Sequence, residues 1–197
     1  MSLNLQLALL RLRAWAFIVL GKPESARACF QDMLVLKPEH PLALASRAHL
    51  DAQAGRTEQA ILDLHRLTEL EPAQAAHWFN RAFLLQAAGR LEEAVPCFER
   101  ATQLNDKLDQ AWYGLGLSLL QLHRIDEAVV ALKRNTELQP MSPYGWTQLA
   151  RAHVQSAQPS KARRVVEHLR GFEPKVAEAL TRELKLDLQQ EPQETPA

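Results

Sequence analysis

Small apolar residues return along this chain at a constant spacing of 34 residues. One set of equivalent positions is occupied only by alanine, at Ala26, Ala60, Ala94, Ala128 and Ala162. A second set holds Ala14, Ala48, Ala82, Gly116 and Ala150. A register kept over five units predicts an array of repeats, because a unit of this length cannot bury its apolar face alone and must stack on its neighbours.

The third unit shows what one repeat contains. A first stripe with the i, i+4, i+7 spacing of a helix face holds Trp78, Ala82 and Leu85. Gly89 and Arg90 interrupt this pattern. A second stripe then holds Ala94, Phe98 and Ala101. Each repeat is therefore predicted to be two antiparallel helices of about 12–14 residues joined by a short turn.

Helix breakers separate the repeats. They stand at Pro38, Pro72, Pro140 and Pro174, with Asp106 in the remaining equivalent position. We therefore expect units at about 7–40, 41–74, 75–108, 109–142 and 143–174. The fold class is all-α, and a single array spans residues 1–190.

The two ends of the array differ. A helix at 175–190 should cap it with an apolar stripe at Val176, Leu180, Leu184 and Leu188. Glu183 and Asp187 on this helix are expected to face water, and residues 191–197 are expected to be disordered. The N-terminal end carries no polar cap, because leucines crowd its first ten residues. Either the array continues upstream, or its first helix has a partner.

The fourth unit carries a recognisable motif. It reads Trp112-Tyr-Gly-Leu115-Gly116-Leu-Ser-Leu119, followed by Ala128, Leu132 and Pro140. In this the chain resembles the tetratricopeptide repeat (TPR) proteins over about residues 7–174. The resemblance implies a right-handed superhelical solenoid of five helix-turn-helix units. The chain departs from the family pattern where arginine replaces leucine, at Arg13, Arg47 and Arg81.

The resemblance also implies that one flank of each first helix faces a concave groove that binds partners. The expected groove residues are Arg11, Trp15, His49, Phe79, Asn80, Phe83, Gln86, Tyr113, Leu117, Tyr144 and Arg151. Their aromatic rings favour an apolar groove that grips a peptide or helix through a few anchors. The alternative is that curvature buries these rings against neighbouring repeats.

One known mode of binding in this family does not fit. Members that clamp the C-terminal carboxylate of chaperones use a Lys and an Asn one turn apart in the first unit. Those positions hold Arg11 and Trp15 here. Asn80 matches one clamp asparagine without its lysine, so we expect another kind of ligand, although Arg11 and Arg151 could meet acidic groups.

Composition narrows the function classes further. The 23 basic residues equal the 23 acidic ones, which argues against a nucleic-acid partner. The seven histidines never pair at i, i+4, so no metal site or cofactor is expected. Cys29 and Cys97 lie two repeats apart, too far for a disulfide. No apolar run approaches the roughly 18 residues that span a bilayer. We expect a soluble, cytoplasmic protein without membrane insertion.

No catalytic constellation stands out, so the chain is expected not to be an enzyme. Gly114 and Gly116 lack the third glycine and the preceding strand of a phosphate loop, and we interpret them as helix contacts. The first functional hypothesis is a protein-interaction scaffold or adaptor that holds a peptide or helix of a partner protein. The second is a structural unit of a larger complex that self-associates as a homo-oligomer through its N-terminal helix. The third is a regulatory or substrate-delivery module for an enzyme.

Overall fold

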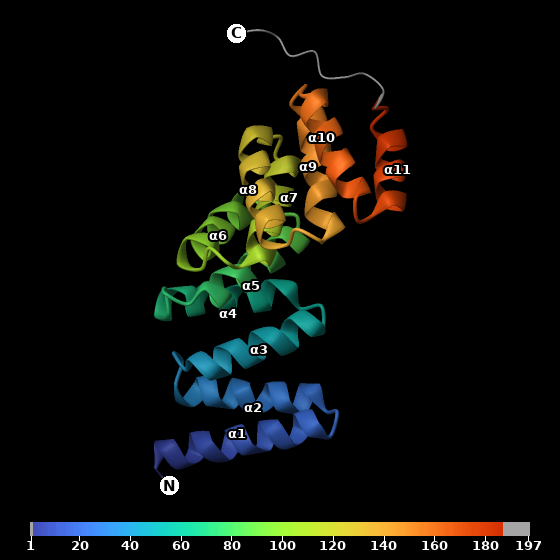
Figure 1. Ribbon diagram of the computed structural model, residues 1–197. Coiled ribbons are helices and arrows are strands. Elements are labelled where there is room, and N and C mark those ends of the chain that lie inside the picture. The colour runs from blue at the N-terminus through green and yellow to red at the C-terminus, as the bar shows by residue number, and fades with distance from the viewer. Residues whose placement is uncertain (1, 187–197) are drawn as a thin grey trace. The chain divides into compact units, whose positions relative to one another are not determined.

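The structure, a computed structural model, describes residues 2–186, and this part of the chain is helical without strands (Figure 1). Five helix pairs follow one another and an eleventh helix completes the described part, as the 34-residue register predicts. The helices are α1 (Leu3–Val19), α2 (Pro23–Leu36), α3 (Pro41–Gln53), α4 (Thr57–Leu70), α5 (Ala75–Ala87), α6 (Leu91–Leu104), α7 (Asp109–Gln121), α8 (Ile125–Leu138), α9 (Pro143–Gln155), α10 (Pro159–Arg170) and α11 (Pro174–Glu183).

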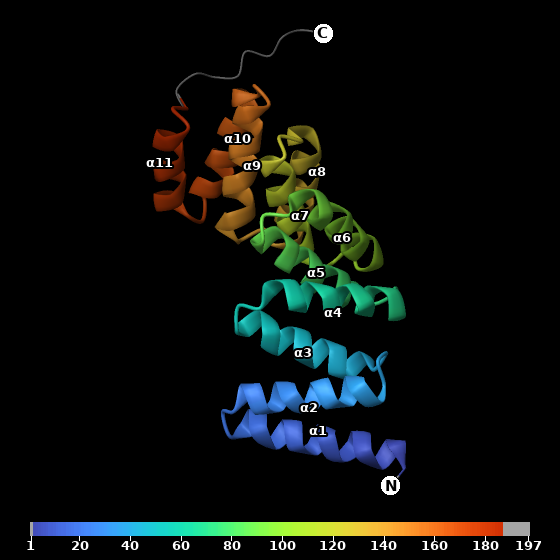
Figure 2. The same cartoon turned by 180° about the vertical axis from the view of Figure 1, so that it is seen from behind.

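The helices form two compact units that divide between Leu104 and Asn105, where the sequence predicts one array over residues 1–190. The first unit contains α1 to α6 and the second contains α7 to α11. Inside each unit, every helix packs against the next one along the chain. Figures 1 and 2 view the molecule from opposite sides, and both show α1 to α4 side by side in chain order.

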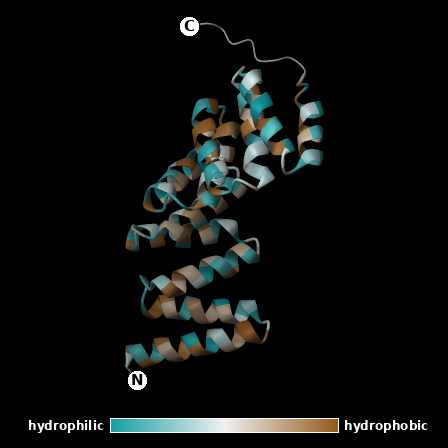
Figure 3. Ribbon diagram, viewed as in Figure 1, coloured by the Kyte–Doolittle hydropathy of each residue, from teal (hydrophilic) through white to brown (hydrophobic). Residues whose placement is uncertain are grey.

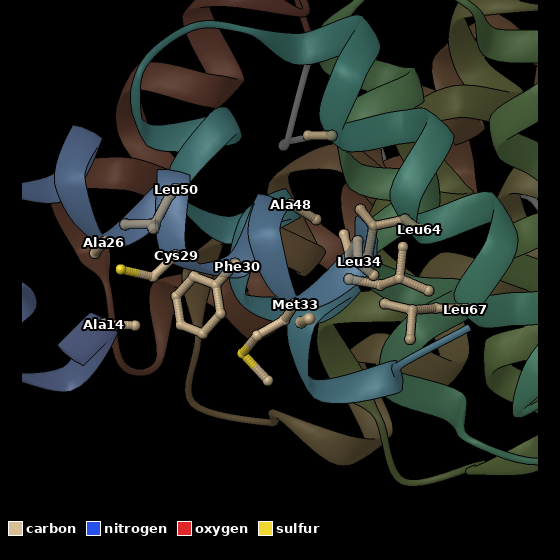
Figure 4. Close-up of a cluster of buried hydrophobic side chains, with 13 residues drawn as sticks. Ala14, Ala26, Cys29, Phe30, Met33, Leu34, Ala48, Leu50, Leu64 and Leu67 are labelled. Atoms are coloured by element: carbon tan, nitrogen blue, oxygen red, sulfur yellow. The ribbon is translucent and has the colours of Figure 1, made fainter. Parts of the chain in front are cut away.

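Small residues allow the paired helices to approach closely. Ala14, Ala26, Ala60, Ala82 and Ala94 are completely buried. Ala14, Ala26 and Ala60 lie in one cluster with larger core side chains, and Figure 4 labels Ala14 and Ala26 beside Phe30 and Met33. Apolar and polar residues alternate along the helices of both units (Figure 3). The second unit repeats the constraint at Gly116, where an added Cβ would lie only 2.6 Å from the Cγ atom of Leu132. This close contact supports the interpretation of Gly116 as a helix-contact residue.

Tryptophan side chains form hydrogen bonds to the turns between repeats. The indole N–H groups of Trp78, Trp112 and Trp146 each donate a hydrogen bond to the backbone carbonyl six residues earlier, at 3.0, 2.9 and 2.8 Å. These carbonyls belong to the breaker positions Pro72, Asp106 and Pro140. The tryptophan therefore packs between helices and also satisfies a turn carbonyl that no helix supplies with a donor.

A residue with left-handed backbone closes the turn inside each helix pair. Three of these residues are glycines, Gly21, Gly55 and Gly89. The last two pairs place His123 (φ 58°) and Ala157 (φ 56°) in the same conformation. After Ala157, the N–H of Gln158 donates to the carbonyl of His153 at 2.8 Å, which is the hydrogen bond of a Schellman cap. The fold thus imposes left-handed backbone on residues with a Cβ atom.

The last described helix is shorter than the sequence predicts. It ends at Glu183, and Lys185 adopts a positive φ of 51°, so the expected helix to residue 190 is not continuous. The cause is a cap in which the N–H of Leu186 donates to the carbonyl of Thr181 at 3.1 Å. The remainder of the predicted helix, residues 187–190, and the predicted tail, 191–197, lie outside the described residues.

His153 is an exception in the core of the second unit. It occupies the column of Leu85 and Leu119, is 3% exposed, and its Nδ1 atom has no hydrogen-bond partner among the described residues. Burial lowers the pKa of His153, and the charges of Lys133 and Lys161 lower it further. The native state therefore holds a neutral imidazole.

We predict that Ala157→Gly stabilises the chain by about 0.5–1 kcal/mol, because glycine adopts left-handed backbone without the Cβ clash. The matched variant Gly89→Ala should lower the free energy of unfolding by about 1 kcal/mol for the same reason. Urea unfolding followed by circular dichroism measures both. If both variants changed the free energy of unfolding in the same direction by the same amount, the argument would be contradicted.

We also predict a loss of stability in mild acid that depends on His153. The unfolded state has the higher histidine pKa, so it binds more protons, and stability falls as pH drops below about 6.5 until the native pKa is passed. His153→Leu restores the residue type of this column and should reduce the difference between the urea midpoints at pH 7.5 and pH 5.5. If His153→Leu left that difference unchanged, the argument would be contradicted.

Candidate partner-binding cleft

A cleft of about 360 Å³ opens in the first unit beside α3 and α5, and we call it the α3–α5 cleft. Its lining residues are Ala45, Ala48, His49, Ala52, Leu64, Ala76, His77, Asn80, Phe83 and Leu84. The α3 side consists mostly of alanines, which leave room because their side chains are short. The α5 side supplies the larger groups. This combination of small and large side chains produces an apolar hollow with a polar edge.

A row of three phenylalanines runs from the core to this cleft. Phe98 on α6 is completely buried, and its ring centroid lies 6.2 Å from that of Phe79. Phe79 in turn lies 6.3 Å from Phe83, which is 54% exposed. Both separations fall in the range of favourable aromatic pairs. The core therefore fixes the inner rings, while the outermost ring remains available at the cleft.

Polar groups lie around the apolar hollow. Asn80 and His49 are exposed, so a carboxamide and an imidazole reach the cleft surface. The Nε2 atom of His77 lies 2.7 Å from the Oε2 atom of Glu71, which holds the imidazole in place. A carboxamide offers both a donor and an acceptor, the two groups that a peptide backbone also carries. This edge can therefore satisfy a backbone that lies along it.

A buried ion pair joins α3, one of the helices that line the cleft, to α4. The Nε atom of Arg47 donates to the Oδ2 atom of Asp63 at 2.7 Å, and its Nη2 atom donates to Oδ1 at 2.5 Å. Gln31 on α2 accepts a third hydrogen bond from the same guanidinium. Both charged side chains are almost fully buried. The bidentate pair thus holds α2, α3 and α4 in one register. It also accounts for Arg47, whose column holds leucine in the second unit.

A second ion cluster involves Asp51 on the same helix. Its carboxylate is completely buried and accepts hydrogen bonds from Arg27 on α2 and from Arg56. Burial alone would raise the pKa of Asp51, but the hydrogen bonds from the two guanidinium groups outweigh burial and lower it. Arg56 of this cluster also pairs with Glu24 at 3.0 Å, and Glu58–Arg90 at 2.8 Å repeats that surface pair one repeat later.

The sequence matches the model of the tetratricopeptide repeat over residues 11–64 and 82–134, more than half of the chain. The chain belongs to the tetratricopeptide repeat family. The TPR fold is a scaffold for protein–protein interaction. No protein of curated function matches the sequence significantly.

Solved TPR structures share the fold at low sequence identity. A crystal structure of MamA superposes with a TM-score of 0.80 and 17% identity, covering 88% of this chain and 94% of MamA. YrrB, described as a TPR protein with an unusual peptide-binding site, gives a TM-score of 0.77 and 16% identity over 86% of this chain and 88% of its own. A TPR protein of Parabacteroides merdae gives 0.76 and 17%, over 91% and 74%. Identities this low establish the fold alone.

The structure brings together only part of the expected TPR groove. His49, Asn80 and Phe83 line the α3–α5 cleft, and Phe79 lies behind Phe83. Six further predicted residues do not line the α3–α5 cleft and are exposed or half-buried. Arg11 and Trp15 are exposed on α1, Gln86 is half-buried on α5, Tyr113 and Leu117 are half-buried on α7, and Tyr144 is exposed on α9.

Arg151 is already engaged by an acidic group of its own chain. Its Nε and Nη2 atoms donate to the two carboxylate oxygens of Glu183, both at 2.8 Å. Hydrogen bonding to Arg151 lowers the pKa of Glu183, and the same bonds raise that of Arg151. Glu183 is exposed, as the sequence predicts, and it also forms this ion pair. An acidic partner at Arg151 would have to displace it.

Sequence reasoning missed the neighbouring stripe of α5. His77 and Leu84 line the cleft together with Asn80, at the i, i+3, i+7 spacing of one helix face. The expected groove was drawn from the adjacent stripe that contains Phe79 and Phe83. The signal was present in the helical period, but the rotation of α5 against α3 decides which stripe faces the hollow.

Three other features of the described residues bear on function: the cysteines, the metal-ligating side chains and the length of the apolar helices. Cys29 and Cys97 are free and buried, and burial raises the pKa of both thiols. No group of three or more metal-ligating side chains occurs among the described residues. No described helix is both long enough and apolar enough to cross a membrane.

We predict different stability effects for the two outer phenylalanines. Phe79→Ala removes the ring between Phe98 and Phe83 and should cost about 2–3 kcal/mol, less than a fully buried phenylalanine. Phe83→Ala truncates a ring that is 54% exposed and should cost less than about 1 kcal/mol. Thermal and urea unfolding of both variants test this order. A larger loss for Phe83→Ala would contradict a role for Phe83 at the surface.

Proposed function

We propose that this TPR protein is an interaction module that holds an extended apolar peptide segment of a partner protein in the α3–α5 cleft. The observation that carries the proposal is the exposed Phe83 ring at the edge of an alanine-lined hollow. A rigid aromatic group beside an empty apolar volume is a common form of binding hot spot, since it buries a large area at a small entropic cost.

The dimensions and chemistry of the cleft favour a peptide with one large apolar side chain. A volume of about 360 Å³ is at the lower end of the range for ligand sites and accommodates one aromatic or large aliphatic side chain. The alanines of α3 would contact one side of that group and Phe83 the other. Asn80 would then pair with the peptide backbone, and His49 would lie at the entrance.

The support of the site also suits binding. Phe83 rests on Phe79 and Phe98, so little ordering is required when a ligand arrives. The hydrogen bonds between Arg47 and Asp63 hold α3 against α4. A site that is ordered before binding loses less entropy on association and so retains more affinity. The TPR protein YrrB, which shares the fold, is described as having a peptide-binding site, and this is consistent with the proposal.

A displayed library of random 12-residue peptides, selected against the full chain, tests the proposal. Selected sequences should share one aromatic or large aliphatic residue. Synthetic copies of the selected peptides should bind the Phe83→Ala variant at least about tenfold more weakly than the unsubstituted protein, as measured by fluorescence polarisation. This is the loss expected of a hot-spot residue. The Asn80→Ala variant should show a smaller loss of peptide affinity, because this change removes one exposed hydrogen bond.

Leu62→Ala provides the matched control. Leu62 on α4 is 55% exposed, nearly the same as Phe83, and does not line the cleft. Peptide affinity should therefore be unchanged in this variant. The proposal fails if no peptide is selected, or if Leu62→Ala and Phe83→Ala weaken binding equally.

A further inference from the structure

The outer face of α1 is exposed at positions that are buried in the next repeat. Leu9 is 43% exposed, whereas Ala43, one repeat later, is completely buried. Arg13 is exposed, whereas Arg47 in the same column is only 6% exposed. In α3 these positions lie against neighbouring helices that include α2. The difference in exposure shows which part of α1 a preceding helix would cover.

Two clefts one repeat apart give the same comparison. The inner cleft is lined by Leu44, Arg66, Glu69 and Leu70, and it is closed on one side by Pro38 and Glu39 from the end of the preceding repeat. The equivalent outer cleft, of about 500 Å³, contains Leu10, Asp32, Val35 and Leu36, and its remaining walls are Gln6, Leu9 and Arg13. We call these seven lining residues, four from α1 and three from α2, the α1 face.

The covering helix makes a recurring polar contact. Arg47 on α3 donates to the side-chain oxygen of Gln31 on α2. Arg81 on α5 occupies the same column and donates to the Oγ1 atom of Thr68 on α4 at 3.4 Å. In both cases the arginine bonds to an oxygen acceptor on the helix before it. Arg13 is the third arginine of this column, at the surface of the α1 face.

A second contact defines the apolar part of the covering helix. Arg27 on α2 pairs with Asp51 on α3, which shows that these two columns meet across the interface. One repeat later the same columns hold Ile61 and Leu85, both buried. The α1 residue of this column is Phe17, which is apolar like Leu85. A helix covering α1 should therefore carry a large aliphatic residue opposite Phe17.

We propose that the α1 face docks an amphipathic helix of a partner protein, in the orientation in which α4 covers α5. The docked helix presents an oxygen acceptor, such as glutamine, threonine or glutamate, to Arg13. About two turns away it presents a large aliphatic residue toward Phe17. Apolar residues between these two points cover Leu9 and Leu10. This site is separate from the α3–α5 cleft and does not depend on the proposed function of that cleft.

A partner helix fits this surface better than a second copy of the chain. The helices α2, α4, α8 and α10 already have the covering face packed against the helix that follows them.

A labelled peptide with the sequence of residues 57–70, stapled across two outward positions to hold it helical, is the probe. It copies α4, which carries both Ile61 and Thr68. Fluorescence polarisation with the full chain should show saturable binding. Leu9→Asp and Arg13→Glu in the protein should each weaken it at least about tenfold, because the first places a charge in the apolar contact and the second removes the donor.

Several controls make the result specific. A peptide carrying the Thr68→Ala change should bind more weakly, whereas the Leu62→Ala peptide, altered at an outward position, should bind as before. Phe83→Ala in the protein should leave binding unchanged, which separates this site from the α3–α5 cleft. Circular dichroism and thermal unfolding establish that each protein variant is folded. If Leu9→Asp does not fold, Arg13→Ala takes its place as a milder change on the same face.

Three outcomes would overturn the proposal. The first is the absence of saturable binding. The second is binding that Leu9→Asp and Arg13→Glu leave unchanged, which would mean that the peptide exchanges with α4 inside the protein. The third is concentration-dependent dimerisation in light scattering that Leu9→Asp abolishes while the peptide does not bind. In that case a second copy of the chain covers the α1 face.

Discussion

Close packing of helix backbones at small residues is the constraint on which the rest of the structure depends. The alanines of the two repeated columns are almost entirely buried, and at Gly116 even one added carbon would collide with Leu132. Helices that approach this closely leave no space for large side chains at the contact. The large residues are therefore moved to the flanks, where they fill the gaps between successive helices or reach the surface.

This constraint gives different roles to side chains of the same type. Phe98 fills the core, Phe79 packs half-buried on it, and Phe83 ends the row at the α3–α5 cleft. Ala48, which belongs to one of the two repeated columns, also lines the hollow, where it and the half-buried Ala45 and Ala52 leave space opposite Phe83. Stability and the capacity to bind thus arise from one arrangement of small and large residues.

Equivalent core positions of different repeats hold either polar or apolar side chains. Arg47 and Asp63 form a buried bidentate pair in the first unit, whereas Leu149 and Val165 occupy the equivalent columns in the second. Replacing a well-satisfied buried ion pair by apolar residues of similar volume is often nearly neutral in stability, so the repeat tolerates both. The ion pair adds direction, because its hydrogen bonds are made in only one register of α2, α3 and α4. His153 lacks such a partner at Nδ1 and is correspondingly sensitive to protonation.

The sequence by itself determined the helices, their pairing and the family, because the 34-residue register records a local pattern that every repeat needs for burial. It also placed His49, Asn80 and Phe83 on the flank of their helices, where they line the α3–α5 cleft, since the helical period separates flank residues from contact residues; their part in binding stays a prediction. Only the tertiary structure decided which flank meets a hollow, because that depends on the rotation of α5 against α3, and it added His77 and Leu84. Only it paired Arg151 with Glu183, because these residues are 32 positions apart. Only it showed that α11 ends at a left-handed turn, which a cap between Leu186 and Thr181 closes. It likewise left Leu9 and Arg13 exposed, although their columns are buried elsewhere, since exposure depends on which helix lies beside them and not on the residue alone.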